Sequence, residues 1–231
     1  MRRTAAVRCA AELGGTALLV GIGTGAIVAA ARFGGVPQGV MALAWFAAVL
    51  LPIWLFIRVS GAHLNPVVTV ALALSGRIAL REAPAYWVGQ FTGAFVGSLT
   101  VWGLLGNAAH LGATTPSIPS LVGVFLSEAA FTALLVATVF CLSDFGEGGG
   151  RWRLLLPPLA VGLATWLIGP WTGSSLNLAR SLAPAVLSST YSDLWVYFVA
   201  NIAGGLVVAL FWRPRTVDRL DRGPGRPSVS S

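Results

Sequence analysis

The segment Ser60-Gly-Ala-His-Leu-Asn-Pro-Val-Val-Thr69 has a close counterpart later in the chain, Thr172-Gly-Ser-Ser-Leu-Asn-Leu-Ala-Arg-Ser181. In each copy an Asn that can cap a helix follows a Gly-containing stretch, and an apolar run follows the Asn. The run after Asn65 ends at Leu74 and the run after Asn177 ends near Leu187, so each is about ten residues long. A helix of that length covers about half the hydrocarbon core of a bilayer, which predicts two re-entrant half-helices.

Two further landmarks indicate that the whole chain is duplicated. Glu12-Leu-Gly-Gly-Thr-Ala-Leu-Leu-Val20 matches Glu128-Ala-Ala-Phe-Thr-Ala-Leu-Leu-Val136 at an offset of 116 residues. The two Asn motifs are 112 residues apart, and Gln90 matches Asn201 at an offset of 111. Each half holds three apolar spans, so the second half must be inverted relative to the first. Inverted repeats place their site at the bilayer midplane, on discontinuous helices.

The composition is that of a membrane protein. Of the 231 residues, 56% are hydrophobic and only 10% are charged, whereas soluble domains carry about 25% charged residues. Apolar stretches of about the length that crosses a bilayer as a helix occupy the ranges 10–31, 38–57, 87–109, 120–142, 154–170 and 191–212. The sequence therefore predicts an all-α membrane protein with six transmembrane helices, two re-entrant half-helices and an inverted repeat.

The arginines predict the orientation in the membrane. All 15 basic residues are Arg, and with both termini inside, all but Arg32 and Arg180 fall on the cytoplasmic side. This positive-inside bias, rather than nucleic-acid binding, accounts for the net charge of +7. We expect a cytoplasmic N-terminus (1–8), one channel domain (9–212, with repeats at about 9–106 and 120–212) and a disordered basic cytoplasmic tail (213–231). The expected location is the cell membrane, plasma or inner.

The two Asn motifs resemble the paired signature loops of the aquaporin, or major intrinsic protein (MIP), family, and the resemblance runs from Glu12 to about Trp212. It implies six-span protomers that assemble as a homotetramer in the lipid bilayer, each with its own pore. It implies no cofactor, no metal and no nucleic-acid partner. The usual Asn-Pro-Ala triplet is replaced by Asn65-Pro66-Val67 and Asn177-Leu178-Ala179. We expect Val67 to add bulk where the half-helix tips touch, and Leu178 to add a backbone donor at a first helical position.

According to the resemblance, the two triplets form the midplane of a pore. Each half-helix N-terminus carries roughly half a positive charge, so two facing tips oppose cations and hydronium. Water would turn its oxygen toward the side-chain donors of Asn65 and Asn177 and its hydrogens outward, which breaks a uniform proton wire. Two further sets of residues belong to this pore: carbonyl acceptors at Gly61, Ala62, His63, Gly173 and Ser175, and Glu12 and Glu128 as acceptors for backbone N–H groups of the loops.

Arg180 is the charged residue of the second re-entrant segment, and an intramembrane Arg is by default a functional residue. The resemblance places it in an outer selectivity filter with Trp45, Thr165 and Ser174. Thr165 is smaller than the His that strict water channels of the family carry, and Trp45 resembles the choice of solute-conducting members. Other markers resemble water-channel members: Ser181, Ala185 and the pair Tyr197-Phe198.

These patterns predict a passive water channel that excludes protons and ions and also passes small neutral solutes. The alternative is a channel mainly for glycerol, urea, ammonia or similar uncharged solutes. A coupled secondary transporter is a more remote alternative, because Glu12 and Glu128 are the only carboxylates inside the predicted spans apart from Asp193, which stands at the very start of 191–212. An enzyme is not expected, since the two His residues are scattered and no carboxylates are grouped.

Overall fold

Long apolar helices make up most of the protein. The computed structural model describes residues 4–144 and 150–212, and these residues contain helices but no strand. In this part of the chain five helical segments are long and apolar enough to cross a membrane. They are α1 (Ala5–Phe33), α2 (Gln38–Ser60), α4 (Ala83–Leu105, preceded by the turn η1, Leu80–Glu82), α5 (Leu121–Asp144) and α9 (Leu194–Phe211). The predicted all-α membrane architecture is confirmed.

The sixth predicted span, 154–170, is broken into shorter helices. It consists of η4 (Arg151–Leu155), α6 (Leu156–Leu167) and α7 (Gly169–Thr172). Pro170 has no N–H to continue the hydrogen-bond ladder of α6, and its ring would clash with a carbonyl of the preceding turn. The helix is therefore interrupted at Ile168, and the sixth predicted span consists of these consecutive helical pieces.

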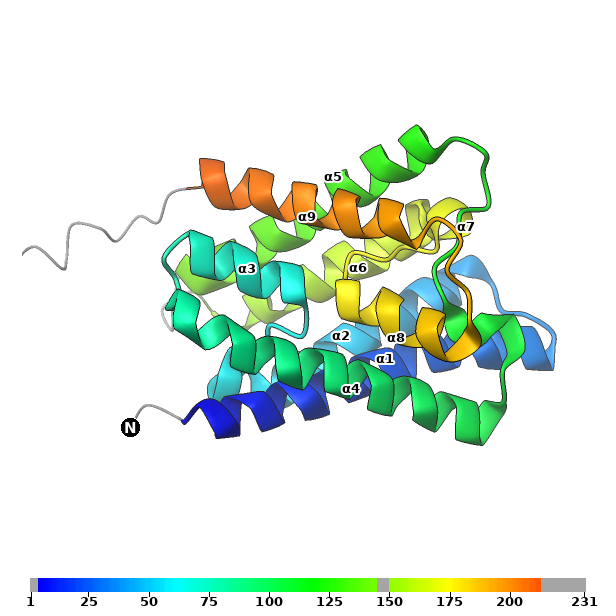
Figure 1. The fold of residues 1–231 in the computed structure, drawn as a ribbon, viewed down its shortest axis with the longest axis horizontal. Coiled ribbons are helices and arrows are strands. Elements are labelled where there is room, and N and C mark those ends of the chain that lie inside the picture. The colour runs from blue at the N-terminus through cyan, green and yellow to red at the C-terminus, as the bar shows by residue number, and fades with distance from the viewer. Residues whose placement is uncertain (1–3, 145–149, 213–231) are drawn as a thin grey trace, which may run out of the picture.

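Two short helices begin at the two Asn motifs. They are α3 (Pro66–Leu74) and α8 (Leu178–Ser188), with Asn65 and Asn177 as their N-caps. Figure 1 shows them lying end to end between α4 and α9, and both contact both of these helices. The two predicted half-helices are thus present, and their N-terminal tips meet in the middle of the bundle.

Glycines allow the backbones of α1 and α4, and of α5 and α9, to touch. A Cβ added to Gly93 of α4 would lie 2.3 Å from the carbonyl oxygen of Leu13, in α1. A Cβ on Gly204 of α9, its counterpart in the repeat, would lie 2.2 Å from the carbonyl oxygen of Ala129, in α5. Small residues at such contacts are typical of helix packing in membranes. The two helix pairs form the walls that support the half-helices.

The start of α1 and the end of α9 lie at the same end of the bundle (Figure 1). Thr4 caps α1 by accepting a hydrogen bond from the amide of Val7, so this helix begins before the predicted boundary at residue 9. Arg8 pairs with Glu82 at 2.5 Å. The short loop η2 (Ala108–Gly112) joins the two halves at the opposite end from the termini. The predicted tail, 213–231, lies outside the described residues.

We predict that Gly93→Ala destabilises the fold, while Gly103→Ala in the same helix does not. The added methyl group at position 93 would press on the backbone of Leu13, whereas nothing lies within 4 Å of a Cβ at Gly103. The expected cost at position 93 is about 1–3 kcal/mol, and Gly103→Ala should be neutral or stabilise by about 0.5–1 kcal/mol. Thermal unfolding in detergent micelles measures both. Equal melting temperatures for the two variants would contradict the close contact.

Candidate functional site

The loops that lead into the two half-helices have the same backbone conformation. The φ angles of Gly61, Ala62 and Leu64 are 90°, 49° and 55°, and those of Gly173, Ser174 and Leu176 are 80°, 47° and 52°. Positive φ at residues other than Gly costs roughly 1–2 kcal/mol each. The loops therefore need contacts that hold them in this shape.

Two fully buried carboxylates supply these contacts. Glu12 of α1 accepts hydrogen bonds from the amides of His63 (3.0 Å) and Leu64 (2.7 Å). Ser60 Oγ and Gln90 Nε2 also donate to Glu12, at 2.6 and 2.7 Å. In the second half, Glu128 of α5 accepts from the amides of Ser175 (2.9 Å) and Leu176 (3.0 Å). Each carboxylate thus binds backbone N–H groups of one loop, and the backbone carbonyls of that loop stay free to accept other hydrogen bonds.

Several of these carbonyls have no protein partner. In the described part of the chain, no hydrogen bond is accepted by the carbonyl oxygens of Gly61, Ala62, His63, Ser174 and Ser175. Backbone carbonyls in a protein interior need a partner, and water can be that partner. The carbonyl of Gly173 already accepts from Arg180 Nη2 at 3.3 Å, and its second lone pair can accept a further hydrogen bond. The arrangement can present acceptors to small hydrogen-bonding molecules.

The two Asn side chains tie the half-helix tips together. Each Oδ1 caps its own helix, accepting from Val67 in the first and from Ala179 and Arg180 in the second. Asn65 Nδ2 donates to the carbonyl of Leu176 at 2.6 Å, and Asn177 Nδ2 donates to the carbonyl of Leu64 at 2.7 Å. An amide nitrogen carries two hydrogens, so one donor per Asn is left for the cavity. The sequence did not indicate that the other donor crosslinks the loops.

A cavity of about 50 Å³ lies beside these tips. Asn65, Asn177, His63, Trp45 and Arg180 line it together with apolar side chains such as those of Leu19, Val49 and Leu135. This volume holds a few water molecules at most. His63 and Val139 also line a much wider vestibule of about 1590 Å³, which lies on the side of Arg8, Arg58 and Arg77. The cavity and the vestibule therefore adjoin at these two residues.

Arg180 and Trp45 close the other end of the cavity. The guanidinium carbon of Arg180 lies 4.6 Å from the centre of the Trp45 ring, and Arg180 Nη1 donates to the carbonyl of Gly112 at 2.7 Å. Trp45 in turn packs on α1 at Gly23, where an added Cβ would lie 2.5 Å from the indole. The structure thus brings two of the predicted filter residues together and fixes both.

The other two predicted filter residues do not line this cavity. Thr165 and Ser174 are buried, at 3% and 4% exposed. Within the described residues, their hydroxyl groups have no hydrogen-bond partner, and neither does Arg180 Nε. Buried polar groups normally have a hydrogen-bond partner, and an ordered water molecule can be that partner.

The remaining triplet residues also lie away from the cavity. Pro66, Val67 and Leu178 line a different, apolar pocket on the outer side of the tips. Ala179 is fully buried in the main core. Val67 was expected to crowd the tip contact, but it packs toward α9, where a Cβ on Gly205 would lie 2.3 Å from Val67 Cγ1. The missing side chain of Gly205 makes room for the larger residue.

Sequence reasoning missed several residues that hold the loops. Tyr86 donates its hydroxyl to the carbonyl of Ser60 and Tyr197 donates to the carbonyl of Thr172, both at 2.6 Å. These tyrosines are 111 residues apart, the offset of Gln90 and Asn201, so the repeat itself could have paired them. Gly112 binds Arg180 through its backbone carbonyl, and nothing in the sequence pattern pointed to this residue.

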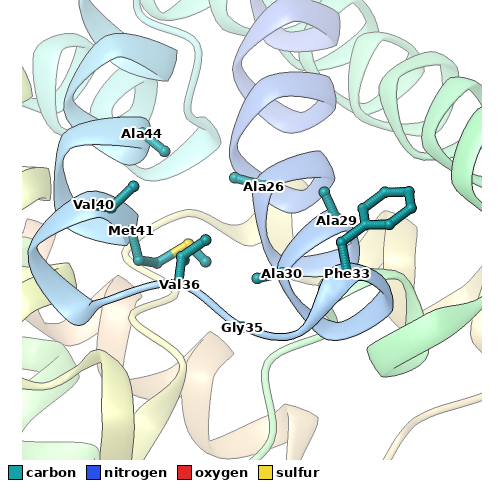
Figure 2. A pocket seen from close by; sticks show the side chains of 9 residues that line it. All are labelled: Ala26, Ala29, Ala30, Phe33, Gly35, Val36, Val40, Met41 and Ala44. Atoms are coloured by element: carbon teal, nitrogen blue, oxygen red, sulfur yellow. The ribbon is translucent and has the colours of Figure 1, made fainter.

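A separate apolar hollow lies near the end of α1 and the start of α2, away from the cavity at the half-helix tips. Figure 2 shows that its lining includes Val36, Met41 and Phe33, and its volume is about 270 Å³. Water in a cavity needs two to four polar partners, and this lining offers apolar side chains. Water is therefore expected beside the polar groups of the two loops rather than in this hollow.

Comparisons with known proteins agree with this geometry. The model of the family described as "Major intrinsic protein" matches residues 2–212. Aquaporin NIP1-1 of Zea mays is 33% identical over 201 residues, which are 86% of this chain and 71% of the relative. The probable aquaporin TIP2-2 of Oryza sativa subsp. japonica is 33% identical over 217 residues, which are 88% of this chain and 84% of the relative.

A solved structure is also similar. The X-ray structure of the aquaglyceroporin from Plasmodium falciparum superimposes with a TM-score of 0.78 at 28% sequence identity. The match covers 94% of this chain and 98% of that one.

We predict that Glu12→Gln and Glu128→Gln loosen the re-entrant loops. Gln replaces one acceptor oxygen with an NH₂ donor that faces the backbone donors, which costs about 1–3 kcal/mol for each unsatisfied group. Glu82→Gln is the matched control, because it removes only a partly exposed ion pair, worth at most about 1 kcal/mol. Hydrogen exchange at residues 61–65 and 173–177 measures the effect. Unchanged protection in both loops would show that the carboxylates do not hold them.

We predict that Leu178→Pro is tolerated. Asn177 has φ −151° and ψ 119°, nearly the values of Asn65 before Pro66, −152° and 123°, and extended backbone suits a residue before Pro. Among the described residues the Leu178 amide donates no hydrogen bond. Leu182→Pro, in the interior of α8, is the control and should cost about 3 kcal/mol or more. Thermal unfolding compares the two, and a comparable loss at position 178 would reveal a partner for its amide.

Proposed function

The chain belongs to the major intrinsic protein family, and on this basis we propose that it is a passive membrane channel for water that excludes protons and ions and passes small neutral solutes more slowly. The relatives named above are described as aquaporins, and the similar solved structure is an aquaglyceroporin. Water and small neutral molecules are therefore the substrate class that the family supports.

The observation that carries this proposal is the meeting of two helix N-termini at a narrow cavity. The tips of α3 and α8 each bring roughly half a positive charge, and both Asn side chains line the space beside them. A cation would face this field without a carboxylate lining the cavity among the described residues. Water can both donate to the free carbonyls and accept from the remaining Asn hydrogens, whereas a cation could use only the carbonyls and would be repelled by the two positive helix tips.

The proposed filter consists of Trp45, Thr165, Ser174 and Arg180. The contact of Arg180 with Trp45 supports a constriction at that end of the cavity. The buried hydroxyls of Thr165 and Ser174 have no protein partner among the described residues, so either water or a polar solute that reached them could bond to them. The second candidate function is a channel mainly for glycerol, urea or ammonia, and the similarity to an aquaglyceroporin favours it. A filter widened by Thr165 is compatible with a water channel and with a channel mainly for solutes.

The proposal includes the placement of the protein in the membrane. We assign it to the cell membrane with both termini cytoplasmic, as a homotetramer with one channel domain per protomer. The vestibule, on the side of Arg8, Arg58 and Arg77, is then the cytoplasmic mouth. Positive charge on this side follows the positive-inside rule.

Stopped-flow shrinkage of proteoliposomes tests the proposal. Water permeability should rise well above that of protein-free liposomes, while an imposed pH gradient should persist. Parallel measurements with glycerol and urea decide between the two candidate functions, since a channel mainly for solutes would pass them at least as readily as water. A coupled transporter would show flux that depends on an ion gradient, and rapid collapse of the pH gradient would refute proton exclusion.

We predict that Thr165→His lowers solute flux proportionally more than water flux. The larger imidazole should narrow the space beside Arg180 and add a hydrogen-bond donor. Stopped-flow permeabilities for water and glycerol in the same vesicle preparation give the ratio. Thr138→His is a control, because Thr138 lies in α5, outside the proposed filter. A solute-to-water ratio that stays the same in Thr165→His would show that position 165 does not face the filter.

A further inference from the structure

A second cavity lies directly behind the half-helix tips, on the side away from the pore. It has a volume of about 260 Å³. Its floor is formed by Val67 and Leu178, the two residues by which the Asn triplets differ from the usual motif, and its walls by Phe91 of α4 and Ile202 and Leu206 of α9. The departures from the motif therefore shape this cavity rather than the pore.

The position of this cavity in the bilayer follows from the half-helices. Pro66 and Leu178, the first residues of α3 and α8, both line it. At 1.5 Å per residue, the nine residues of α3 cover about 14 Å, close to half of the ~30 Å hydrocarbon core. Since the two half-helices meet tip to tip, their first residues lie near the bilayer midplane. The cavity therefore lies at the depth in the bilayer where acyl chains end.

The lining excludes water as the occupant. All of the side chains that line this cavity belong to apolar residue types, and the only polar atom among them is the indole nitrogen of Trp87, which donates to the carbonyl of Pro66 at 3.4 Å. A buried water needs two to four polar partners, whereas a dry apolar cavity of about 150 Å³ accepts a molecule the size of benzene. An occupant of this larger cavity must therefore be apolar.

The cavity opens toward the lipid-facing surface. Ile202 on its rim is 42% exposed, and its neighbours on the same helices, Val88 and Val199, are 61% and 49% exposed. From these observations we infer that the cavity is a binding site for the terminal segment of a lipid acyl chain, which packs against Val67 and Leu178 and supports the tips from behind. This site does not depend on which solute passes through the pore.

Photochemical labelling of the reconstituted protein tests the site. Liposomes of dioleoylphosphatidylcholine carry a phosphatidylcholine with a diazirine either at the end of one acyl chain or next to the glycerol. After irradiation, mass spectrometry quantifies adducts on the α4 segment that contains Trp87 and Phe91. The chain-end probe should label this segment and the glycerol-proximal probe should not.

Two substitutions in α9 make the test specific. Leu206→Phe fills the cavity from its wall, whereas Leu210→Phe makes the same change one turn further on, at a residue that is 69% exposed and does not line the cavity. Because both lie in α9, neither alters the α4 segment that is measured. Leu206→Phe should lower chain-end labelling of α4 at least about threefold, since the site no longer has room, and Leu210→Phe should leave it unchanged.

Three outcomes would overturn the inference. One is equal labelling in wild type, Leu206→Phe and Leu210→Phe, and another is equal labelling by both probes. The third is an unlabelled α4 segment that instead crosslinks to a second copy of the protein. If Leu206→Phe does not fold, Ile202→Phe fills the same cavity from the rim. Loss of water flux with intact labelling would count against the proposed function only, so the two ideas fail separately.

Discussion

Backbone polar groups at membrane depth must find partners, and this requirement shapes the protein around its two loops. A stretch of non-helical backbone cannot sit in hydrocarbon unless its N–H and C=O groups are paired. Glu12 and Glu128 meet the need on one side of each loop. The carbonyls on the other side are then left for molecules in the cavity. The two buried carboxylates bind the N–H groups of the loops, and this leaves the C=O groups to form the polar lining of the cavity.

The inverted repeat keeps this arrangement while its side chains vary. Val67 and Ala179 occupy equivalent places in the two triplets, and Gly205 and Ala94 occupy equivalent places in α9 and α4. The larger Val67 faces the smaller Gly205, while Ala179 and Ala94 share the main core cluster. Cores tolerate changes best when total volume is kept. The departure from the usual triplet is therefore matched by a change on the neighbouring helix.

Much of the fold and part of the site could be predicted from the sequence. The half-helices begin at Asn65 and Asn177 because caps and apolar runs are local signals. The interruption at Ile168 could also have been foreseen, since Pro170 stands inside the predicted span. The bonds of the Asn side chains to the carbonyls of Leu64 and Leu176, and of Arg180 to the carbonyl of Gly112, could not. Backbone carbonyls are present at every residue, so only the tertiary structure selects the ones that matter.

The two halves stop being equivalent at the proposed filter. The position of Arg180 corresponds to Val68 in the first half, and Val68 lines the cavity as an apolar residue. Arg180 donates a hydrogen bond to the carbonyl of Gly173. The corresponding carbonyl of Gly61 has no protein partner in the described structure. One charged side chain thus closes one end of the path, and the end at His63 opens into the vestibule. In the proposed channel, the symmetric scaffold would conduct in both directions, and the single Arg would place the selective step at one mouth.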